Sequence, residues 1–364
     1  MLRKIFFLKL LDLLFGKPAC FLLKKHSASP SNKNRNLLII RPGGIGDAVL
    51  LAPAVGAIKK KFPQAEVSVL AEKRNAGIFA LIPGVDLVLR YDVPKEFLAA
   101  FRLRPDVVID TEQYHRLSAV VARLMGANIL IGFGTNERAR LFHHAIGYSH
   151  DNYEAISFMQ LLGPLGIDPI DIHETPFLTI PVAAQSRAAN LLGLLVETPF
   201  VTIFPGASIP ERRWSGERFG EVAASLAALG YRIVIVGGQE DRATADLIIA
   251  DGDGLNLAGQ TDLTETAAII RQSAMLISGD SGLLHIGVGL GIPTLSLFGP
   301  GISQKWAPKG PQHRVLNHHL PCSPCTRFGY TQKCRHNAKC IQEITPDEVV
   351  QAAIMMLKSL NKKG

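Results

Sequence analysis

Residues 278–300 read SGDSGLLHIGVGLGIPTLSLFGP, and this stretch decides the fold that the sequence predicts. The pattern indicates a buried strand ending at Ile277, a tight turn over Gly279–Gly282, a short helix over Leu283–Leu290 and a returning strand over Pro293–Phe298. A strand that turns sharply into a helix leaves the first N–H groups of the helix unpaired beside its positive dipole end. Such a turn binds phosphate readily, although a capped core helix with a buried histidine has the same pattern.

Polar residues on this turn are the first candidates for a site. Asp280 and Ser281 are of the types that cap a helix and reach a ligand, and Gly282 offers a backbone N–H. His285 falls one turn further along the same helix face.

The chain on either side alternates short apolar runs with helical stretches, which predicts an α/β fold with two doubly wound halves. In the first half we expect a helix over Ala48–Lys61 and strands over Leu37–Ile40, Glu66–Leu70, Val85–Leu89, Val107–Asp110 and Ile129–Gly132. In the second half we expect strands over Phe200–Phe204 and Tyr231–Val236, with helices over Gly216–Leu229 and Pro346–Leu360, the last capped by Thr345.

Four segments follow from this alternation. They are a leader with linker (residues 1–35), an N-terminal domain (36–175), a C-terminal domain (176–345) with a Cys-rich loop (320–341), and a final helix (346–364). Asp168–Pro181 is rich in proline and predicts the interdomain linker. Two such halves usually bind ligands in a cleft between facing strand ends.

The basic charge is concentrated in the leader. The whole chain has a formal net charge of +8, and residues 1–35 contain eight Lys or Arg residues and one Asp, hence seven of those charges. The remainder is nearly neutral, which argues against a broad nucleic-acid-binding face and favours an anionic membrane surface as the partner.

The leader is also rich in Leu and Phe, but its apolar runs are too short to cross a bilayer. Written as a helix, it carries Lys9, Asp12 and Gly16 on one narrow polar stripe, which suits a helix lying in the membrane interface. The alternative is a helix that docks on the protein's own core or on a partner.

The first strand of the first half is followed by Arg41-Pro42-Gly43-Gly44-Ile45-Gly46-Asp47. No acidic residue follows where a nicotinamide site needs one, so a dinucleotide site is not predicted. Asp47 either caps the next helix or acts as a general base beside a loop that glycines keep open to a substrate.

Two loops of the second half carry charged residues. Arg212 and Arg213 precede Trp214 on the first, and guanidinium groups suit a diphosphate; the alternative is a surface arginine pair anchored by Trp214. Glu240 follows Gly237-Gly238 on the second, where it either accepts hydrogen bonds from a ribose or caps a helix.

Taken together, these motifs resemble glycosyltransferase family 9, the lipopolysaccharide heptosyltransferases. The resemblance covers residues 36–360 and rests on Gly44-x-Gly46-Asp47, Pro205-Gly206 to Arg213-Trp214, Gly237-Gly238-x-Glu240, Leu257-Ala258-Gly259, and Gly279-Asp280-Ser281-Gly282-x-x-His285 to Phe298-Gly299-Pro300. It implies a GT-B fold and a metal-independent, inverting transfer of heptose from ADP-heptose to a lipid A–core acceptor.

The resemblance also implies roles for single residues. Asp47 would be the catalytic base on an acceptor-side loop with Gly43, Gly44 and Gly46. The donor would be bound by Ser208, Arg212, Glu240, Asp280, Ser281, Gly282 and His285. The chain departs from the family at Gly44, where serine is common, and over Asp110–Tyr114, so the resemblance is weaker on the acceptor side. Asp251-Gly252-Asp253 superficially matches a metal-binding motif, but its setting predicts a turn.

Four of the five cysteines cluster as Cys322, Cys325, Cys334 and Cys340. Such a cluster binds zinc or an iron–sulfur cluster, or forms two disulfides. A cytoplasmic location disfavours disulfides, and four thiolates favour a structural zinc ion with no open position for catalysis.

Together with these observations, the resemblance implies a peripheral glycosyltransferase on the cytoplasmic face of the inner membrane of a Gram-negative bacterium, needing no cofactor for catalysis. Its expected partners are an ADP-sugar, a lipid-linked core acceptor and the membrane surface, and no nucleic acid. The alternatives are transfer from another nucleotide sugar, a GT-B epimerase, or a noncatalytic nucleotide- or metal-binding protein.

Overall fold

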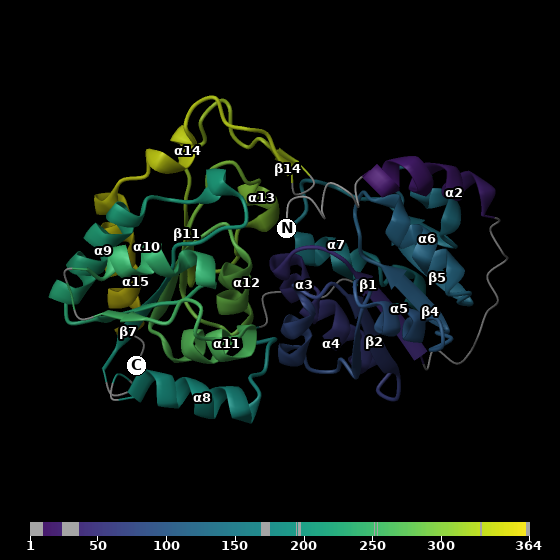
Figure 1. The fold of residues 1–364 in the computed structure, drawn as a ribbon, viewed down its shortest axis with the longest axis horizontal. Coiled ribbons are helices and arrows are strands. Elements are labelled where there is room, and N and C mark those ends of the chain that lie inside the picture. Colours follow the sequence, from purple (N-terminus) through teal and green to yellow (C-terminus); the bar gives the residue numbers. More distant parts are fainter. Residues whose placement is uncertain are drawn as a thin grey trace. The chain divides into compact units, whose positions relative to one another are not determined.

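A computed structural model describes residues 10–23, 36–168, 175–193, 195, 198–250, 252, 254–327 and 330–361. The chain divides into two compact units, residues 1–172 (unit 1) and 173–364 (unit 2). Each unit holds a six-stranded parallel sheet flanked by helices (Figure 1). The predicted α/β fold with two doubly wound halves is therefore confirmed.

The sheet of unit 1 has the strand order β3-β2-β1-β4-β5-β6, with every neighbouring pair parallel. Its central strand reads NLLIIR, and five of its six residues are buried, as expected for a strand covered on both faces. The elements are η1 (Asp12–Gly16), α2 (Lys17–Leu22), β1 (Asn36–Arg41), α3 (Ile45–Leu50), α4 (Ala52–Lys61), β2 (Glu66–Ala71), η2 (Ala76–Leu81), β3 (Leu87–Arg90), α5 (Pro94–Ala100), β4 (Val107–Asp110), α6 (Arg116–Leu124), β5 (Ile129–Phe133), η3 (Glu137–Leu141), β6 (His144–Ile146), α7 (Glu154–Gln160) and η4 (Gly163–Leu165).

One predicted helix of unit 1 is two helices in the structure. The sequence predicts a continuous helix over Ala48–Lys61, whereas α3 ends at Leu50 and α4 begins at Ala52. Pro53 lies in the first turn of α4, where its missing N–H costs no helical hydrogen bond. The break at Leu51 confines Asp47 to a short helix that directly follows the glycine loop.

The sheet of unit 2 repeats the pattern with the strand order β12-β11-β10-β7-β8-β9. Its elements are α8 (Val182–Leu192), β7 (Phe200–Phe204), η6 (Pro210–Arg212), α9 (Gly216–Ala228), β8 (Arg232–Ile235), η7 (Gln239–Asp241), α10 (Arg242–Ile248), β9 (Gly254–Asn256), α11 (Leu263–Gln272), β10 (Met275–Gly279), α12 (Gly282–Gly289), β11 (Thr294–Leu297), α13 (Ser303–Trp306), β12 (His313–Leu316), β13 (Thr326–Arg327), β14 (Tyr330–Thr331), α14 (Lys339–Gln342) and α15 (Pro346–Asn361). The two short strands β13 and β14 form an antiparallel hairpin in the predicted Cys-rich loop.

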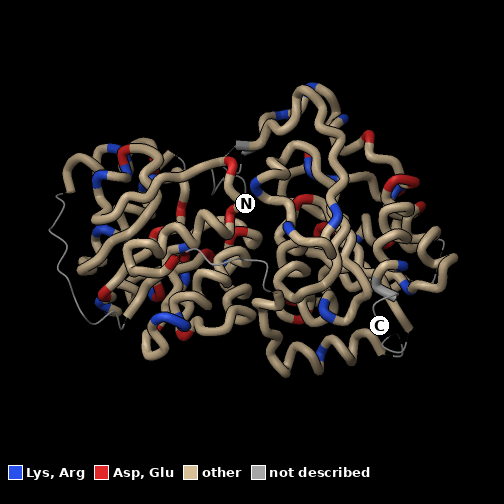
Figure 2. The backbone as a smooth tube through the Cα atoms, turned by 180° about the vertical axis from the view of Figure 1, so that it is seen from behind, with Lys and Arg blue, Asp and Glu red and all other residues tan. Residues whose placement is uncertain are grey.

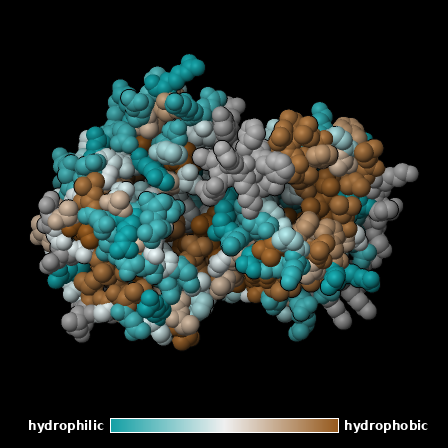
Figure 3. Space-filling view, in the orientation of Figure 1, coloured by the Kyte–Doolittle hydropathy of each residue, from teal (hydrophilic) through white to brown (hydrophobic). Residues whose placement is uncertain are grey.

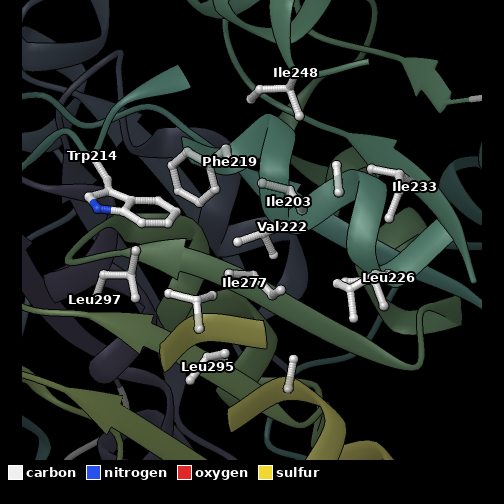
Figure 4. Packing of buried hydrophobic residues seen from close by; sticks show 14 of the residues in the cluster. Ile203, Trp214, Phe219, Val222, Leu226, Ile233, Ile248, Ile277, Leu295 and Leu297 are labelled. Atoms are coloured by element: carbon white, nitrogen blue, oxygen red, sulfur yellow. The ribbon is translucent and has the colours of Figure 1, made fainter. Parts of the chain in front are cut away.

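The core of unit 2 joins elements from both ends of its sequence. Figure 4 shows Trp214 and Phe219 beside Ile277 and Leu297, with Leu226 and Ile233 further along the cluster. The rings of Trp214 and Phe219 meet edge to face at 4.8 Å between centroids. The final helix α15 packs on the same core through Val349, Ala352 and Leu357, among others.

The final helix begins as predicted. Thr345 Oγ1 accepts the N–H of Glu348 at 3.3 Å, and Glu348 Oε2 accepts the N–H of Thr345 at 2.7 Å. This reciprocal pair is a capping box, which satisfies two N–H groups at the start of the helix.

The leader differs from its prediction in one respect. Asp12 is 4% exposed and Gly16 is buried, and both lie against α6 instead of facing water. Lys9 and residues 24–35 of the predicted leader with linker lie outside the described residues, as do residues 169–174 of the predicted interdomain linker and the Asp251-Gly252-Asp253 turn apart from Gly252.

Charged positions are interspersed over both units. Figure 2 shows Lys and Arg among Asp and Glu along the described backbone. No helix in the described part of the chain is long and apolar enough to cross a membrane.

Candidate active site

The first candidate group lies on the turn from β1 to α3 in unit 1. Arg41 ends the strand, Gly43 has a φ of +104°, and Gly44 is the extended residue before the helix. The φ of Gly43 is one that side chains disfavour, and a Cβ on Gly44 would lie 3.2 Å from a carboxylate oxygen of Asp47. Gly46 lies in the first helical turn. The three glycines therefore place no side chains of their own beside Asp47.

Asp47 is the third residue of α3 and is not its N-cap. No described side chain caps this helix. The Asp47 side chain is 20% exposed, but its Oδ1 is buried and accepts no hydrogen bond from the described residues. An available, partly buried carboxylate is what a general base requires.

Burial sets the basicity of Asp47. Loss of hydration raises the pKa of Asp47 to about 6; the Arg41 guanidinium, 3.8 Å away, lowers it, whereas Glu154 and Glu112 raise it. With this pKa, Asp47 is ionised at pH 7 and is a stronger base than an ordinary aspartate.

Three of the charged neighbours of Asp47 were not predicted as site residues. Arg41 is 1% exposed, donates to the carbonyl of Thr111 at 2.9 Å, and places Nη2 3.8 Å from both Asp47 and Glu112. Glu154 is fully buried at the start of α7. The one signal in the sequence was a charged residue, Arg41, directly after the apolar run Leu37–Ile40.

The second candidate group lies on the turn from β10 to α12 in unit 2. Asp280 follows the buried strand, and Ser281 is the N-cap of α12, accepting the N–H of Leu284 on its Oγ at 3.3 Å. The hydroxyls of Ser278 and Ser281 lie 2.8 Å apart and tie the cap to the strand. Gly282 is the first helical residue, so its N–H belongs to the set without helical partners.

Arg212 reaches this turn from η6. Its Nη1 lies 3.0 Å from Asp280 Oδ2, with the two side chains 14% and 6% exposed. Burial raises the pKa of Asp280, and the Arg212 guanidinium opposes that rise. A Cβ on Gly279 would lie 3.2 Å from the carbonyl oxygen of Arg212, so glycine permits the close approach.

His285 completes the group one turn along α12. It is 2% exposed, and burial, with Arg212 adding to the effect, lowers its pKa to about 4, so the ring is neutral at pH 7. Its Nδ1 and the Nε of Arg212 are buried and have no hydrogen-bond partner within the described residues. Buried polar atoms normally have partners, so Arg212 Nε and the first N–H groups of α12 are available to a ligand, although the guanidinium is also ion-paired with Asp280.

The remaining predicted donor residues lie on neighbouring loops. Ser208 and Glu240 are exposed and follow β7 and β8, which are adjacent strands. Asp241, which was not predicted, is 5% exposed and accepts the N–H of Gly238 at 3.0 Å. A Cβ on Gly206 would lie 2.5 Å from Asp241, so this carboxylate packs the two loops together.

Arg213 and Trp214 have structural contacts. Arg213 Nε donates to the carbonyl of Ala207 at 2.9 Å within its own loop. Trp214 is 4% exposed and donates from Nε1 to the carbonyl of Ile344 at 3.0 Å. The two predicted arginines therefore have different roles. Arg212 contacts Asp280, whereas Arg213 and Trp214 hold the loop on the core.

All five cysteines are free thiols. The negative charges of neighbouring cysteines contribute to the raised pKa values of Cys325 and Cys340, after burial as the larger cause, so the clustered thiols lie near one another. Cys334 Sγ accepts backbone N–H groups from His336 and Ala338 at 3.4 and 3.3 Å. Among the residues that the structure describes, no three His, Cys, Asp or Glu side chains are placed to hold a metal ion.

A cavity of about 600 Å³ lies elsewhere in unit 2. Its walls come from residues 176–180, α8, α11 and Leu290, and none of the predicted site residues lines it. The candidate groups are therefore defined by their charges and hydrogen-bonding atoms, not by this cavity.

Comparisons with known proteins identify the family of the chain. A family model described as glycosyltransferase family 9 (heptosyltransferase) matches residues 102–336. Lipopolysaccharide heptosyltransferase 2 of Salmonella typhimurium is 23% identical, with 86% of this chain and 96% of that protein covered. Lipooligosaccharide heptosyltransferase 2 of Haemophilus influenzae is 26% identical, with 77% and 88% covered.

Solved structures show the same fold. ADP-heptose lps heptosyltransferase II of E. coli has a TM-score of 0.72 at 22% identity, with 90% of this chain and all of that chain covered. E. coli heptosyltransferase WaaC, solved with ADP-2-deoxy-2-fluoro heptose, has a TM-score of 0.66 at 17% identity, with 88% and 99% covered.

Proposed function

The chain belongs to glycosyltransferase family 9, and on that premise we propose that it transfers heptose from ADP-heptose to a lipid A–core oligosaccharide in lipopolysaccharide biosynthesis. The observation that carries the proposal is the Arg212 guanidinium, which pairs with Asp280 directly before α12 and has a buried Nε without a hydrogen-bond partner in the described residues. The named activities of the relatives and the ADP-sugar in the WaaC structure support the choice of donor.

The proposed reaction is an inverting displacement. Asp47 takes the proton of the acceptor hydroxyl as that oxygen bonds to the anomeric carbon. The bond from this carbon to the phosphate oxygen breaks on the opposite face, and its electron pair leaves with ADP.

The leaving diphosphate gains negative charge, which must be stabilised where it develops. We assign this role to Arg212 and to the N–H groups of Gly282 and its neighbours in the first turn of α12, in place of a metal ion. Ser208 and Glu240, exposed on the adjoining loops, are assigned to the phosphate and ribose ends of the donor.

An acceptor built on lipid A is held in a membrane. We therefore propose that the protein works as a peripheral enzyme on the cytoplasmic face of the inner membrane. The basic leader supports this location, because anionic lipids attract clustered Lys and Arg residues.

Nucleotide selectivity tests the donor assignment directly. We expect ADP to raise the melting temperature of the purified protein, because a ligand at 100 times its dissociation constant adds about 2.7 kcal/mol to the unfolding free energy. UDP, GDP, CMP and NAD at the same concentration are the controls. Stabilisation by UDP or GDP alone would exclude ADP-heptose but leave a transferase, and stabilisation by NAD alone would overturn the proposal.

The structural zinc ion also remains a proposal, with Cys322, Cys325, Cys334 and Cys340 as its ligands. The free thiols and the two N–H groups directed at Cys334 Sγ support it, since thiolate ligands commonly accept such bonds. We expect about one zinc ion per chain by plasma mass spectrometry, lost in Cys325→Ser. A metal-free protein with four titratable thiols and an unchanged melting temperature would contradict this.

A further inference from the structure

The helical segment formed by η1 and α2 has two very different sides. Asp12, Gly16 and Cys20, spaced four residues apart, are buried against the rest of unit 1. Cys20 is 1% exposed within the core cluster that contains Ala119 and Ala122 of α6. The inward side is thus narrow and is formed by small or polar residues.

Asp12 fixes this side on the start of α6. Its Oδ1 accepts the N–H groups of Arg116 and Leu117 at 2.6 and 2.7 Å, so it serves as a helix cap supplied by a segment 104 residues away. The Arg116 guanidinium lies 3.4 Å from Asp12 and also bonds Glu137 at 2.8 Å.

Two further features keep this orientation. Burial alone raises the pKa of Asp12, but hydrogen bonds from His115 and from the backbone N–H groups that Asp12 caps bring it below its usual value, so the cap is ionised at neutral pH. A Cβ on Gly16 would lie 3.0 Å from the Cβ of Arg116, so a larger residue would push the helix away.

The opposite side of the segment carries large apolar side chains that face solvent. We call it the leader face; it consists of Leu10, Leu13, Leu14, Phe15, Phe21 and Leu22, which are 40–79% exposed. Six of the fourteen exposed large hydrophobic side chains of the described residues thus lie within thirteen positions. Figure 3 shows the hydrophobic surface over α2 (compare Figure 1). Exposed apolar patches of this kind mark interaction sites.

Basic residues border the leader face. The Lys17 side chain is 54% exposed, and the Arg140 guanidinium lies 4.7 Å from the centre of the Phe21 ring. In the sequence, Arg3, Lys4 and Lys9 precede the segment, and Lys24 and Lys25 follow it. Leu and Phe flanked by Lys and Arg suit the headgroup region of an anionic bilayer, where rings and alkyl chains bury and cations meet phosphates.

We propose that the leader face inserts into the surface of an anionic lipid bilayer, and that the contact of Asp12 with α6 holds it in the orientation required. This inference rests on the proposed function only for its setting, a lipid-linked acceptor, and deepens it by naming the surface that meets the lipid. In this proposal Asp12 and Gly16 contact the rest of the protein, and the apolar residues of the leader face contact the membrane.

Flotation with lipid vesicles tests the proposal on the full chain. We expect the wild type to float with vesicles containing phosphatidylglycerol and much less with phosphatidylcholine alone. Leu14→Asp/Phe15→Asp should lower the bound fraction at least about tenfold, since two apolar side chains no longer bury in lipid. Leu229→Asp is the matched control, because Leu229 in unit 2 is 53% exposed and Leu14 is 54% exposed. Equal flotation of the double variant and the wild type would overturn the proposal.

A second variant does not depend on introducing charge. Phe15→Trp should show a blue-shifted emission with anionic vesicles and quenching by brominated lipid, whereas Leu229→Trp should show neither. Vesicle binding without any change in Phe15→Trp emission would exclude insertion of the leader face. Light scattering tests whether the leader face instead binds a second copy of the chain. If the wild type is a dimer, the double variant is a monomer and neither binds vesicles, the leader face is a protein interface.

Failure of the proposed lipid contact can be distinguished from failure of the proposed function. The double variant should keep the melting-temperature increase with ADP, because its substitutions lie outside the donor group. Vesicle binding by a wild type that never transfers heptose would overturn the proposed function and support the lipid contact of the leader face. Heptose transfer by a wild type that does not bind vesicles would overturn the lipid contact and support the proposed function.

Discussion

Replacing Asp47 with Asn is expected to lower kcat by about 10²–10⁴-fold, the usual contribution of a general base. Asparagine keeps the size and the polar oxygen of the side chain but cannot accept the proton of the acceptor hydroxyl. Stabilisation by ADP should be unchanged, because Asp47 lies in unit 1 and the donor group in unit 2. The measurement is a transfer assay alongside the nucleotide melting series. A variant with wild-type kcat would remove Asp47 from the mechanism.

The same variant should be more stable than the wild type at high pH. The folded pKa of Asp47, about 6, exceeds the ordinary value of 3.8, so folding favours its protonated form. This contribution to stability is complete below pH ~4 and is lost as the pH rises through 6, after which the buried charge costs up to about 3 kcal/mol. The substituted asparagine carries no charge, so the advantage of Asp47→Asn in melting temperature should be large at pH 8 and small at pH 4.5.

The pH profile gives an independent check. Because Asp47 must be ionised, kcat/KM of the wild type should fall as the pH drops below about 6. Glu112 raises the pKa of Asp47, so Glu112→Gln should move this limb to lower pH. A limb that stays in place in Glu112→Gln, or moves to higher pH, would contradict the electrostatic account of Asp47.

Replacing Arg212 with Ala is expected to abolish stabilisation by ADP and to destabilise the free protein. The guanidinium is assigned to the diphosphate, and its loss also leaves the Asp280 carboxylate buried without its ion-pair partner. Removing one partner of a buried pair costs about 3 kcal/mol or more. The measurements are denaturant unfolding of the free protein and its melting temperature with and without ADP.

A second substitution separates the two effects. Asp280→Asn in the Arg212→Ala background removes the unpaired charge, so it should restore much of the unfolding free energy without restoring the response to ADP. Arg187→Ala, which removes the same charge from a 54% exposed side chain in unit 2, is the matched control and should change neither quantity. Full stabilisation of Arg212→Ala by ADP would show that the nucleotide binds elsewhere.

Much of the fold was predictable from the sequence because its signals are local. Apolar runs such as Leu37–Ile40 and Phe200–Phe204 predict buried parallel strands, and both lie within observed strands. The turn after Gly279 carries a serine cap, so the start of α12 at Gly282 was predicted to within one residue. The break at Leu51 was missed because alanine, valine and leucine continue the helical pattern on both sides of it, although Pro53 marks the start of a new helix.

The candidate site was predictable only in part. Asp47 and Asp280 stand out as acids on glycine-rich loops, but nothing local indicates the residues that determine their chemistry. Arg212 reaches Asp280 across 68 residues of sequence, and Glu112 and Glu154 act on Asp47 from later segments of unit 1. The four clustered cysteines are near one another in sequence: Cys322, Cys325, Cys334 and Cys340. Whether their thiols are free, oxidised or bound to a metal also depends on the folded conformation of the loop.

The sequence alone therefore determined the alternation of strands and helices, the two halves, the glycine-rich turns and the amphipathic leader, since each follows from neighbouring residues and a backbone period. Tertiary structure decided that Asp12 faces α6 and leaves Phe15 to solvent, that Arg212 and not Arg213 pairs with Asp280, and that Asp47 has a pKa near 6. Hydration and charge at a side chain depend on every segment packed around it, and that environment exists only once the chain has folded.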